Sequence, residues 1–204
     1  ADAVVEIKGS QTDIWTGEEA LWQMCYQKLY DTAPWGKLFR TKIVKEVPFP
    51  ENMFFEDLAV VCQMIGAARS VAAQSGSRYH YRRNPEGTMN GNMIRLLDEI
   101  KAADMMYTYA KSLLGNESRA AENRKFSAYA QVLMKLPRSG YEAERTRLWK
   151  YLCAVRGIVL TDHHARVKNR FAALTSYCGE RFMRALWVTM EKIHAARGIG
   201  EMKS

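Results

Sequence analysis

The chain has 204 residues, of which 48% are hydrophobic and 25% charged, so it is neither disordered nor low in complexity. Its 30 basic and 22 acidic side chains give a net charge of +8, and no uncharged apolar run approaches the roughly 18 residues of a membrane span. The four cysteines are widely spaced and form no C-x-x-C pair, which indicates reduced thiols in a cytoplasmic protein: Cys25, Cys62, Cys153 and Cys178.

The N-terminal part of the chain predicts one capped helix followed by irregular structure. Thr16 is a good N-cap residue, and Glu19 follows it at the spacing of a capping box. Apolar residues then recur at helical spacing, so we expect this helix to run to about Tyr30. Proline and glycine interrupt residues 33–50, which predicts loops, one helical turn and a short strand.

The next part of the chain predicts a second helix and two strands. Apolar residues at helical spacing indicate a helix that starts near Phe55. Residues 71–74 and 77–83 are typical of short strands, and residues 84–87 are typical of a turn.

From Asn92 onward the pattern changes to helical. Apolar residues recur at helical spacing through most of this part, which predicts helices that pack into a small bundle. Residues 91–204 hold 20 basic and 11 acidic side chains and one of the five prolines. We therefore predict a boundary near Gly91, between residues 1–90 and a basic helical extension over residues 91–204. The expected fold class is α+β and predominantly helical.

Two adjacent carboxylates fall in the first turn of the predicted second helix. Glu56 and Asp57 follow the stretch FPENMFF, and the unpaired amides and dipole of a helix start favour acidic residues there. On this interpretation they only stabilise the helix end. An ionised carboxylate at a helix start is also able to act as a general base, and spacing alone leaves both interpretations open.

Three blocks in order carry a family resemblance: PWGKLFR, then FPENMFFED, then YHYRRNPEGTM. Together they resemble family 2 glycosyltransferases, which are bacterial enzymes with the nucleotide-sugar-binding fold called GT-A and which build cell-surface polysaccharides. The resemblance covers residues 16–90 and, more loosely, the helical tail. It implies that residues 1–90 are the C-terminal portion of a GT-A catalytic domain and that the helical part is an extension of it.

The resemblance also implies roles for individual residues. Asp57, with Glu56 beside it, would be the catalytic base that deprotonates the attacking acceptor hydroxyl in an inverting sugar transfer. Trp35 would stack on a sugar face, the alternative being a core anchor, and Lys37 would reach a phosphate or a carboxylate.

The YHYRR block resembles the segment of the family that closes over the donor diphosphate. His80 would approach the metal, and Arg82 and Arg83 would approach the phosphates. Neighbouring residues on a strand point to opposite faces, so at most one of the two arginines should reach a given phosphate. A lone histidine on such a strand is otherwise structural or solvent-facing.

The chain departs from the family pattern in its donor side. It has no opening apolar strand with the family's V-I-I-P type motif and no D-x-D to hold a divalent metal. We therefore expect a donor-binding half before Ala1 that supplies most ligands of a Mg²⁺ or Mn²⁺ ion, and we expect the present chain alone to be inactive. The implied partners are a nucleotide-sugar donor and a saccharide or lipid-linked saccharide acceptor.

The basic tail admits three interpretations, namely a solvated helix face, a membrane-surface patch and a nucleic-acid footprint. Lipid-linked acceptors favour peripheral contact with an anionic inner membrane over nucleic acid, for which no binding motif is present. The Asp162-His163-His164 run lacks further acidic ligands nearby in sequence, so we predict no metal site there. The rival function for the whole chain is a non-enzymatic helical binding module in which Glu56 and Asp57 are only capping charges.

Overall fold

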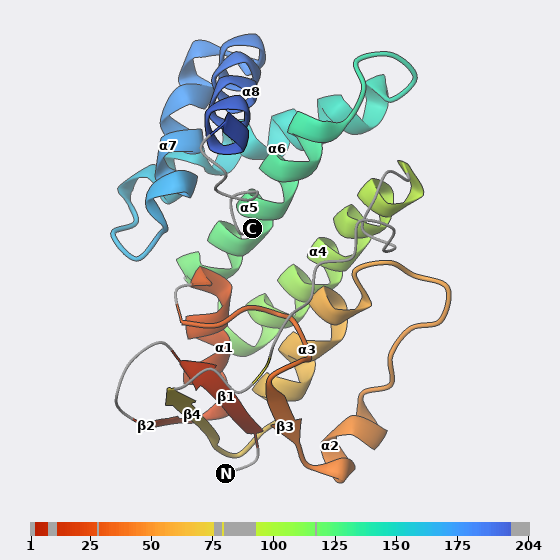
Figure 1. Ribbon diagram of the computed structural model, residues 1–204, viewed down its shortest axis with the longest axis vertical. Helices are drawn as coiled ribbons and strands as arrows, with labels where there is room; N and C mark the ends of the chain where they lie inside the picture. Colours follow the sequence, from red (N-terminus) through yellow and green to blue (C-terminus); the bar gives the residue numbers. More distant parts are fainter. Residues whose placement is uncertain are drawn as a thin grey trace. The chain divides into compact units, whose positions relative to one another are not determined.

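The computed structural model describes residues 3–7, 12–27, 29–75, 79, 93–116 and 118–196 (Figure 1). The chain forms two compact units, residues 1–125 and residues 126–204, which we call the first and the second unit. Helices predominate in both, and a single small sheet is described in the first unit, so the predicted predominantly helical α+β class is confirmed at that level.

The sheet of the first unit has four strands in the order β2-β4-β1-β3. Their bounds are β1 Ala3–Ile7, β2 Thr12–Trp15, β3 Lys37–Phe39 and β4 Val71–Ser75. β4 pairs parallel with β1 and antiparallel with β2, and β3 pairs antiparallel with β1. The strand predicted at residues 71–74 is confirmed as β4. The strand predicted at residues 77–83 lies outside the described residues except for Tyr79, which is in irregular backbone.

Helices α1 and α3 lie beside this sheet, and α4 packs on α3 (Figure 1). The helices of the first unit are α1 Gly17–Tyr26, α2 Thr41–Glu46, α3 Glu56–Gly66, α4 Met93–Leu114 and the first residues of α5 Arg119–Lys135. The Tyr109 hydroxyl on α4 donates to the carbonyl of Gln63 on α3 over 3.3 Å. The predicted short strand and helical turn within residues 33–50 are confirmed as β3 and α2.

The predicted capping box at the start of α1 is confirmed. The backbone N–H of Glu19 donates to the Thr16 hydroxyl over 3.2 Å, and the backbone N–H of Thr16 donates to the Glu19 carboxylate over 2.8 Å. These two bonds satisfy amides that a helix start otherwise leaves without partners. The helix ends at Tyr26 rather than near Tyr30, because Gln27 adopts a left-handed conformation with φ 50°.

Gly17 allows α1 to begin in direct contact with the end of α3. A Cβ atom at residue 17 would lie 2.4 Å from the carbonyl oxygen of Ala68 and 2.7 Å from that of Gly66. Because both contacts are to backbone, we expect Gly17→Ala to lower the free energy of unfolding by about 1–3 kcal/mol, as overpacking does elsewhere. Urea unfolding measures this, with the exposed neighbour Glu18→Ala as control. Equal stability of the two variants would mean that α1 and α3 move apart without lowering the free energy of unfolding.

The second unit consists of the end of α5 and the helices α6 Glu142–Thr161, α7 Val167–Thr175, η1 Ser176–Cys178 and α8 Glu180–Ala196. α6 packs on α7, and α8 contacts both α7 and η1. Leu148 and Leu152 of α6 are fully buried, as their spacing predicts. On α8 Met183 is buried, whereas Phe182 and Ile193 are exposed.

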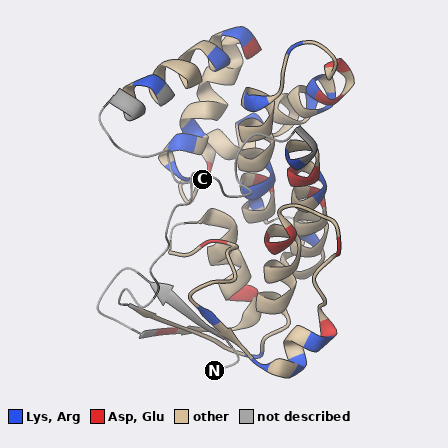
Figure 2. Cartoon of the chain, turned by 45° about the vertical axis from the view of Figure 1, so that its right-hand side comes forward, with Lys and Arg blue, Asp and Glu red and all other residues tan. Residues whose placement is uncertain are grey.

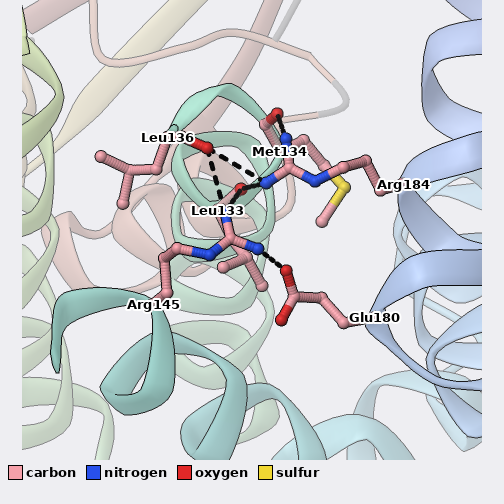
Figure 3. Close-up of polar contacts among 6 residues, drawn as sticks. All are labelled: Leu133, Met134, Leu136, Arg145, Glu180 and Arg184. Carbon is pink, nitrogen blue, oxygen red and sulfur yellow. Dashed lines mark hydrogen bonds and ion pairs between the residues drawn. The ribbon is translucent and has the colours of Figure 1, made fainter. Parts of the chain in front are cut away.

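Two arginines hold the C-terminal carbonyls of α5 (Figure 3). Arg145 of α6 donates to the carbonyl of Leu136 over 3.0 Å. Arg184 of α8 donates to the carbonyls of Leu133, Met134 and Leu136 over 2.5, 2.7 and 3.2 Å. The carbonyls at a helix end have no partners within the helix, so the two guanidinium groups act as its C-cap. Glu180 forms an ion pair with Arg145 and so offsets part of the buried positive charge.

The structural division differs from the boundary expected near Gly91. α4 packs on α1 and α3 and therefore belongs to the first unit, and the division falls between Lys125 and Phe126. The charge follows this division, since residues 1–125 hold 16 basic and 16 acidic side chains, while residues 126–204 hold 14 and 6. The whole net charge of +8 is therefore in the second unit.

Candidate functional site

Asp57 lies in the first turn of α3, as its sequence motif predicts, and Glu56 is the first residue of that helix. Its carboxylate accepts a hydrogen bond from the backbone N–H of Leu58 over 2.7 Å. Burial raises the pKa of the Asp57 carboxyl; the Leu58 bond lowers it, the charges of Glu56 and Asp31 raise it further, and Arg124 opposes them. The result is a carboxylate held in a partly dry setting, whose raised pKa makes it a stronger base.

The loop before Asp57 has a strained backbone. Asn52 and Phe55 both adopt left-handed conformations, with φ values of 56° and 58°. Such conformations cost non-glycine residues about 1–3 kcal/mol each and persist where surrounding contacts enforce them. The strain therefore indicates that the position of the Glu56–Asp57 turn is fixed by tertiary contacts.

These contacts come from α4. The Asp98 carboxylate accepts a hydrogen bond from the backbone N–H of Phe54 over 3.1 Å. The guanidinium of Arg95 lies 5.1 Å from the ring centroid of Phe54 and 5.6 Å from that of Phe55. Sequence reasoning missed both residues, because they lie about 40 positions downstream in an ordinary helical pattern with no local signal.

Lys37 points inward rather than toward solvent. Its side chain is 4% exposed, and its ammonium donates to the carbonyl of Ala33 and lies 3.8 Å from the Asp31 carboxylate. Burial lowers the pKa of Lys37, while the carboxylates of Asp31 and Asp57 raise it. Lys37 thus contacts a carboxylate of its own chain, and its predicted contact with a ligand phosphate stays a prediction.

Arg124 of α5 completes this group of charges, and no local pattern in the sequence indicates its role. Its side chain is buried. Burial lowers its pKa, and the charges that oppose this shift include those of Glu99, Asp57 and Asp31. We call Asp31, Lys37, Asp57 and Arg124 the Asp57 cluster. It places two buried cations near the partly buried carboxylate of Asp57 and the exposed carboxylate of Asp31.

Trp35 is not the core anchor that one interpretation predicted, because 43% of its surface is exposed. Its ring stacks on that of Tyr79, which is 47% exposed, with centroids 6.5 Å apart and planes 20° apart. Gly36 lies between Trp35 and Lys37 in the chain and has φ 72°. This left-handed conformation lets Trp35 face outward while Lys37 faces inward. The two rings form an exposed aromatic platform, two residues along the chain from a member of the Asp57 cluster.

Other predicted positions are placed differently. His80, Arg82 and Arg83 lie outside the described residues. Asp162 is buried in the turn between α6 and α7, where its carboxylate accepts the backbone N–H of His164 over 2.9 Å. Within the described ranges, no three His, Cys, Asp or Glu side chains are grouped so as to hold a metal.

A shallow hollow of about 310 Å³ lies away from the predicted site residues, none of which lines it. Its lining residues are Trp15, Glu18, Glu19, Trp22, Gln23 and Leu114.

The raised pKa of Asp57 has a consequence for stability. The unfolded carboxyl ionises near its ordinary value of 3.8, before the folded one, so ionisation favours the unfolded chain as pH rises between those two values. We expect Asp57→Asn to be more stable than the parent at neutral pH, with the difference growing through that window and vanishing in acid. Urea unfolding from pH 3 to pH 8 measures it, with Glu18→Gln, a change to an exposed carboxylate in the first turn of α1, as control. A less stable Asp57→Asn would show that Asp57 mainly stabilises the helix start.

The described part of the chain contains no helix with the length and apolar character needed to cross a bilayer. Comparisons with protein-family models, with curated proteins and with solved structures found no match to the chain.

Proposed function

We propose that the chain is the acceptor side of an inverting glycosyltransferase of the family 2 type, acting in the cytoplasm in the synthesis of a cell-surface polysaccharide. The observation that carries the proposal is the Asp57 carboxylate, partly buried with a raised pKa at the start of α3. A general base works best when its pKa approaches the operating pH while it remains ionised. The strained loop and its contacts with α4 hold this carboxylate in place.

In the proposed reaction Asp57 accepts the proton of an acceptor hydroxyl as its oxygen attacks the anomeric carbon of the donor. The bond from that carbon to the diphosphate breaks, and the nucleoside diphosphate leaves. The charge of Arg124 lowers the pKa of Asp57 and so opposes part of the effect of its burial, and Asp57 in turn raises the pKa of Lys37. The divalent metal that the resemblance implies would neutralise the leaving diphosphate; among the described residues, no three His, Cys, Asp or Glu side chains are grouped so as to hold it.

The aromatic platform of Trp35 and Tyr79 is the proposed acceptor-binding surface. Its exposed ring faces offer an apolar surface to the C–H face of a sugar. We expect Trp35→Ala to raise the acceptor KM by about 10-fold with little change in kcat, because a stacking contact is made equally in the ground and transition states. Initial rates at varied acceptor concentration measure it, with the exposed Phe49→Ala as control. An unchanged KM would remove Trp35 from the acceptor site.

The direct test uses the full product of the gene, including whatever precedes Ala1. Release of nucleoside diphosphate from a panel of nucleotide sugars, with Mg²⁺ or Mn²⁺, is expected for one donor class. A protein that releases none, while circular dichroism shows it folded, would reject the transferase.

A second candidate, a non-enzymatic binding module, is favoured by the concentration of all net charge in the second unit. The two candidates rest on different units of the chain. A binding function of the second unit is therefore compatible with catalysis by the first.

A further inference from the structure

The outer face of α7 is apolar where a solvent-facing helix is normally polar. Val167, Phe171 and Leu174 are all exposed, Val167 by 81%, and their spacing places them on one face of the helix. The exposed Tyr177 follows in η1. A contiguous exposed apolar row of this kind marks a surface that contacts something other than water.

A similar mixture of exposed apolar and basic side chains occurs on α8, which contacts α7 and η1. Phe182 and Ile193 are exposed and lie three helical turns apart on the same side, each directly preceded by an exposed cation, Arg181 and Lys192. On α7 the exposed Arg170 likewise precedes Phe171. Large apolar side chains and cations therefore alternate along both helices.

Basic residues outnumber acidic ones in this part of the chain (Figure 2). Residues 163–193 contain six Lys or Arg residues and two acidic residues, Glu180 and Glu191, and Glu180 is paired with Arg145. The guanidinium of Arg156 lies 3.9 Å from the ring centroid of Tyr177. The second unit as a whole carries the net charge of +8.

The combination of exposed apolar side chains and positive charge favours one kind of binding partner over the others. A second copy of the chain would bring the same positive charge against it, which is unfavourable. A nucleic acid would use the cations but not the aliphatic side chains of Val167 and Leu174. An anionic lipid surface uses both, because apolar side chains enter the acyl boundary while arginine and lysine meet the headgroups.

We propose that the outer face of α7, η1 and α8 docks on an anionic lipid surface. The exposed side chains that we assign to this lipid-docking face are Val167, Arg170, Phe171, Leu174, Tyr177, Arg181, Phe182, Lys192 and Ile193. The proposal does not depend on the transfer reaction, since every residue of the face is in the second unit.

The test is co-sedimentation of the 204-residue chain with vesicles. One set is pure phosphatidylcholine, and the other contains about one third phosphatidylglycerol. We expect binding to the anionic vesicles to be at least about 10-fold tighter, as several cations near the surface imply. The difference should fall as salt rises from about 0.1 M to about 1 M and the Debye length shrinks from about 10 Å to about 3 Å.

Paired variants separate the apolar and the charged contributions. Phe171→Ser with Leu174→Ser should weaken vesicle binding by about 10-fold or more, whereas Ile14→Ser with Leu38→Ser, which removes two exposed apolar side chains from the first unit, should not. Arg181→Gln with Lys192→Gln should reduce the preference for anionic vesicles several-fold.

The matched control for the charge variant is Lys42→Gln with Lys45→Gln, which removes two exposed cations from α2 and should leave binding unchanged. Circular dichroism checks the fold. If the double apolar variant misfolds, Val167→Ser replaces it, because that side chain is 81% exposed.

Several results would overturn the proposal. These are absence of binding, equal binding to both vesicle types, and full binding by the apolar variants. Light scattering that shows a dimer dependent on Phe171 and Leu174, without vesicle binding, would assign the face to a second copy. Binding of DNA that is unaffected by the apolar variants, again without vesicle binding, would assign the cations to nucleic acid.

Discussion

In the proposed sugar transfer, Asp57→Asn should lower turnover by about 100-fold or more, with a much smaller change in the KM for the donor. An asparagine preserves the shape and is able to accept the hydrogen bond from Leu58, but it is unable to take a proton from the acceptor hydroxyl. A general base contributes about 10²–10⁴-fold, and it acts on the transition state rather than on binding. Glu18→Gln, which changes an exposed carboxylate in the first turn of α1, is the control and should retain most activity.

The pH profile gives a second readout of the same residue. The base works only when ionised, so the rate should fall as pH drops through the raised pKa of Asp57. The residual activity of Asp57→Asn should lack this acid limb. Near-normal turnover with an unchanged profile would return Asp57 to the role of a helix-capping charge.

Arg184→Ala should cause the largest loss of stability among the changes considered, about 2–4 kcal/mol in the free energy of unfolding. Arg184 donates to three carbonyls at the end of α5, and its removal leaves them with fewer partners inside the second unit (Figure 3). Each buried polar group that loses its partner costs about 1–3 kcal/mol. Chemical unfolding monitored by circular dichroism measures the change.

Two further variants test the cause of that loss. Arg181→Ala removes an exposed arginine from the same helix and should change stability by less than about 0.5 kcal/mol. Arg184→Lys should recover little, because a single ammonium does not reproduce the spread of a guanidinium over several carbonyls. Full recovery by lysine would show that charge, and not hydrogen-bond geometry, stabilises the end of α5.

Local features of the fold were predictable from sequence. The capping box of Thr16 and Glu19 is complete within four residues, and the apolar residues of α3 recur at helical spacing along the chain. Both predictions are confirmed. β1 was not predicted, because a strand of five residues is stabilised by β3 and β4, which lie far along the chain. The two compact units divide at Lys125 rather than near Gly91, because the helical pattern of α4 does not reveal that it packs on α3.

The residues of the candidate site likewise fall into those that a short motif predicts and those that only tertiary packing brings together. Asp57 and Trp35 were found because each belongs to a short motif that is readable along the chain. Arg124 was missed, since only tertiary packing brings its guanidinium close enough to influence the pKa of Asp57. The inward direction of Lys37 was also missed, because it follows from the positive φ of Gly36, which no neighbouring residue predicts.

The uneven division of charge also bears on how the chain behaves in solution. Residues 1–125 have no net charge at neutral pH, so they contribute little of the long-range repulsion that keeps protein molecules apart. That repulsion comes from residues 126–204, and salt weakens it. A shortened protein that ends at Lys125 is therefore expected to have its solubility minimum near neutral pH, because it lacks the residues that carry the net charge.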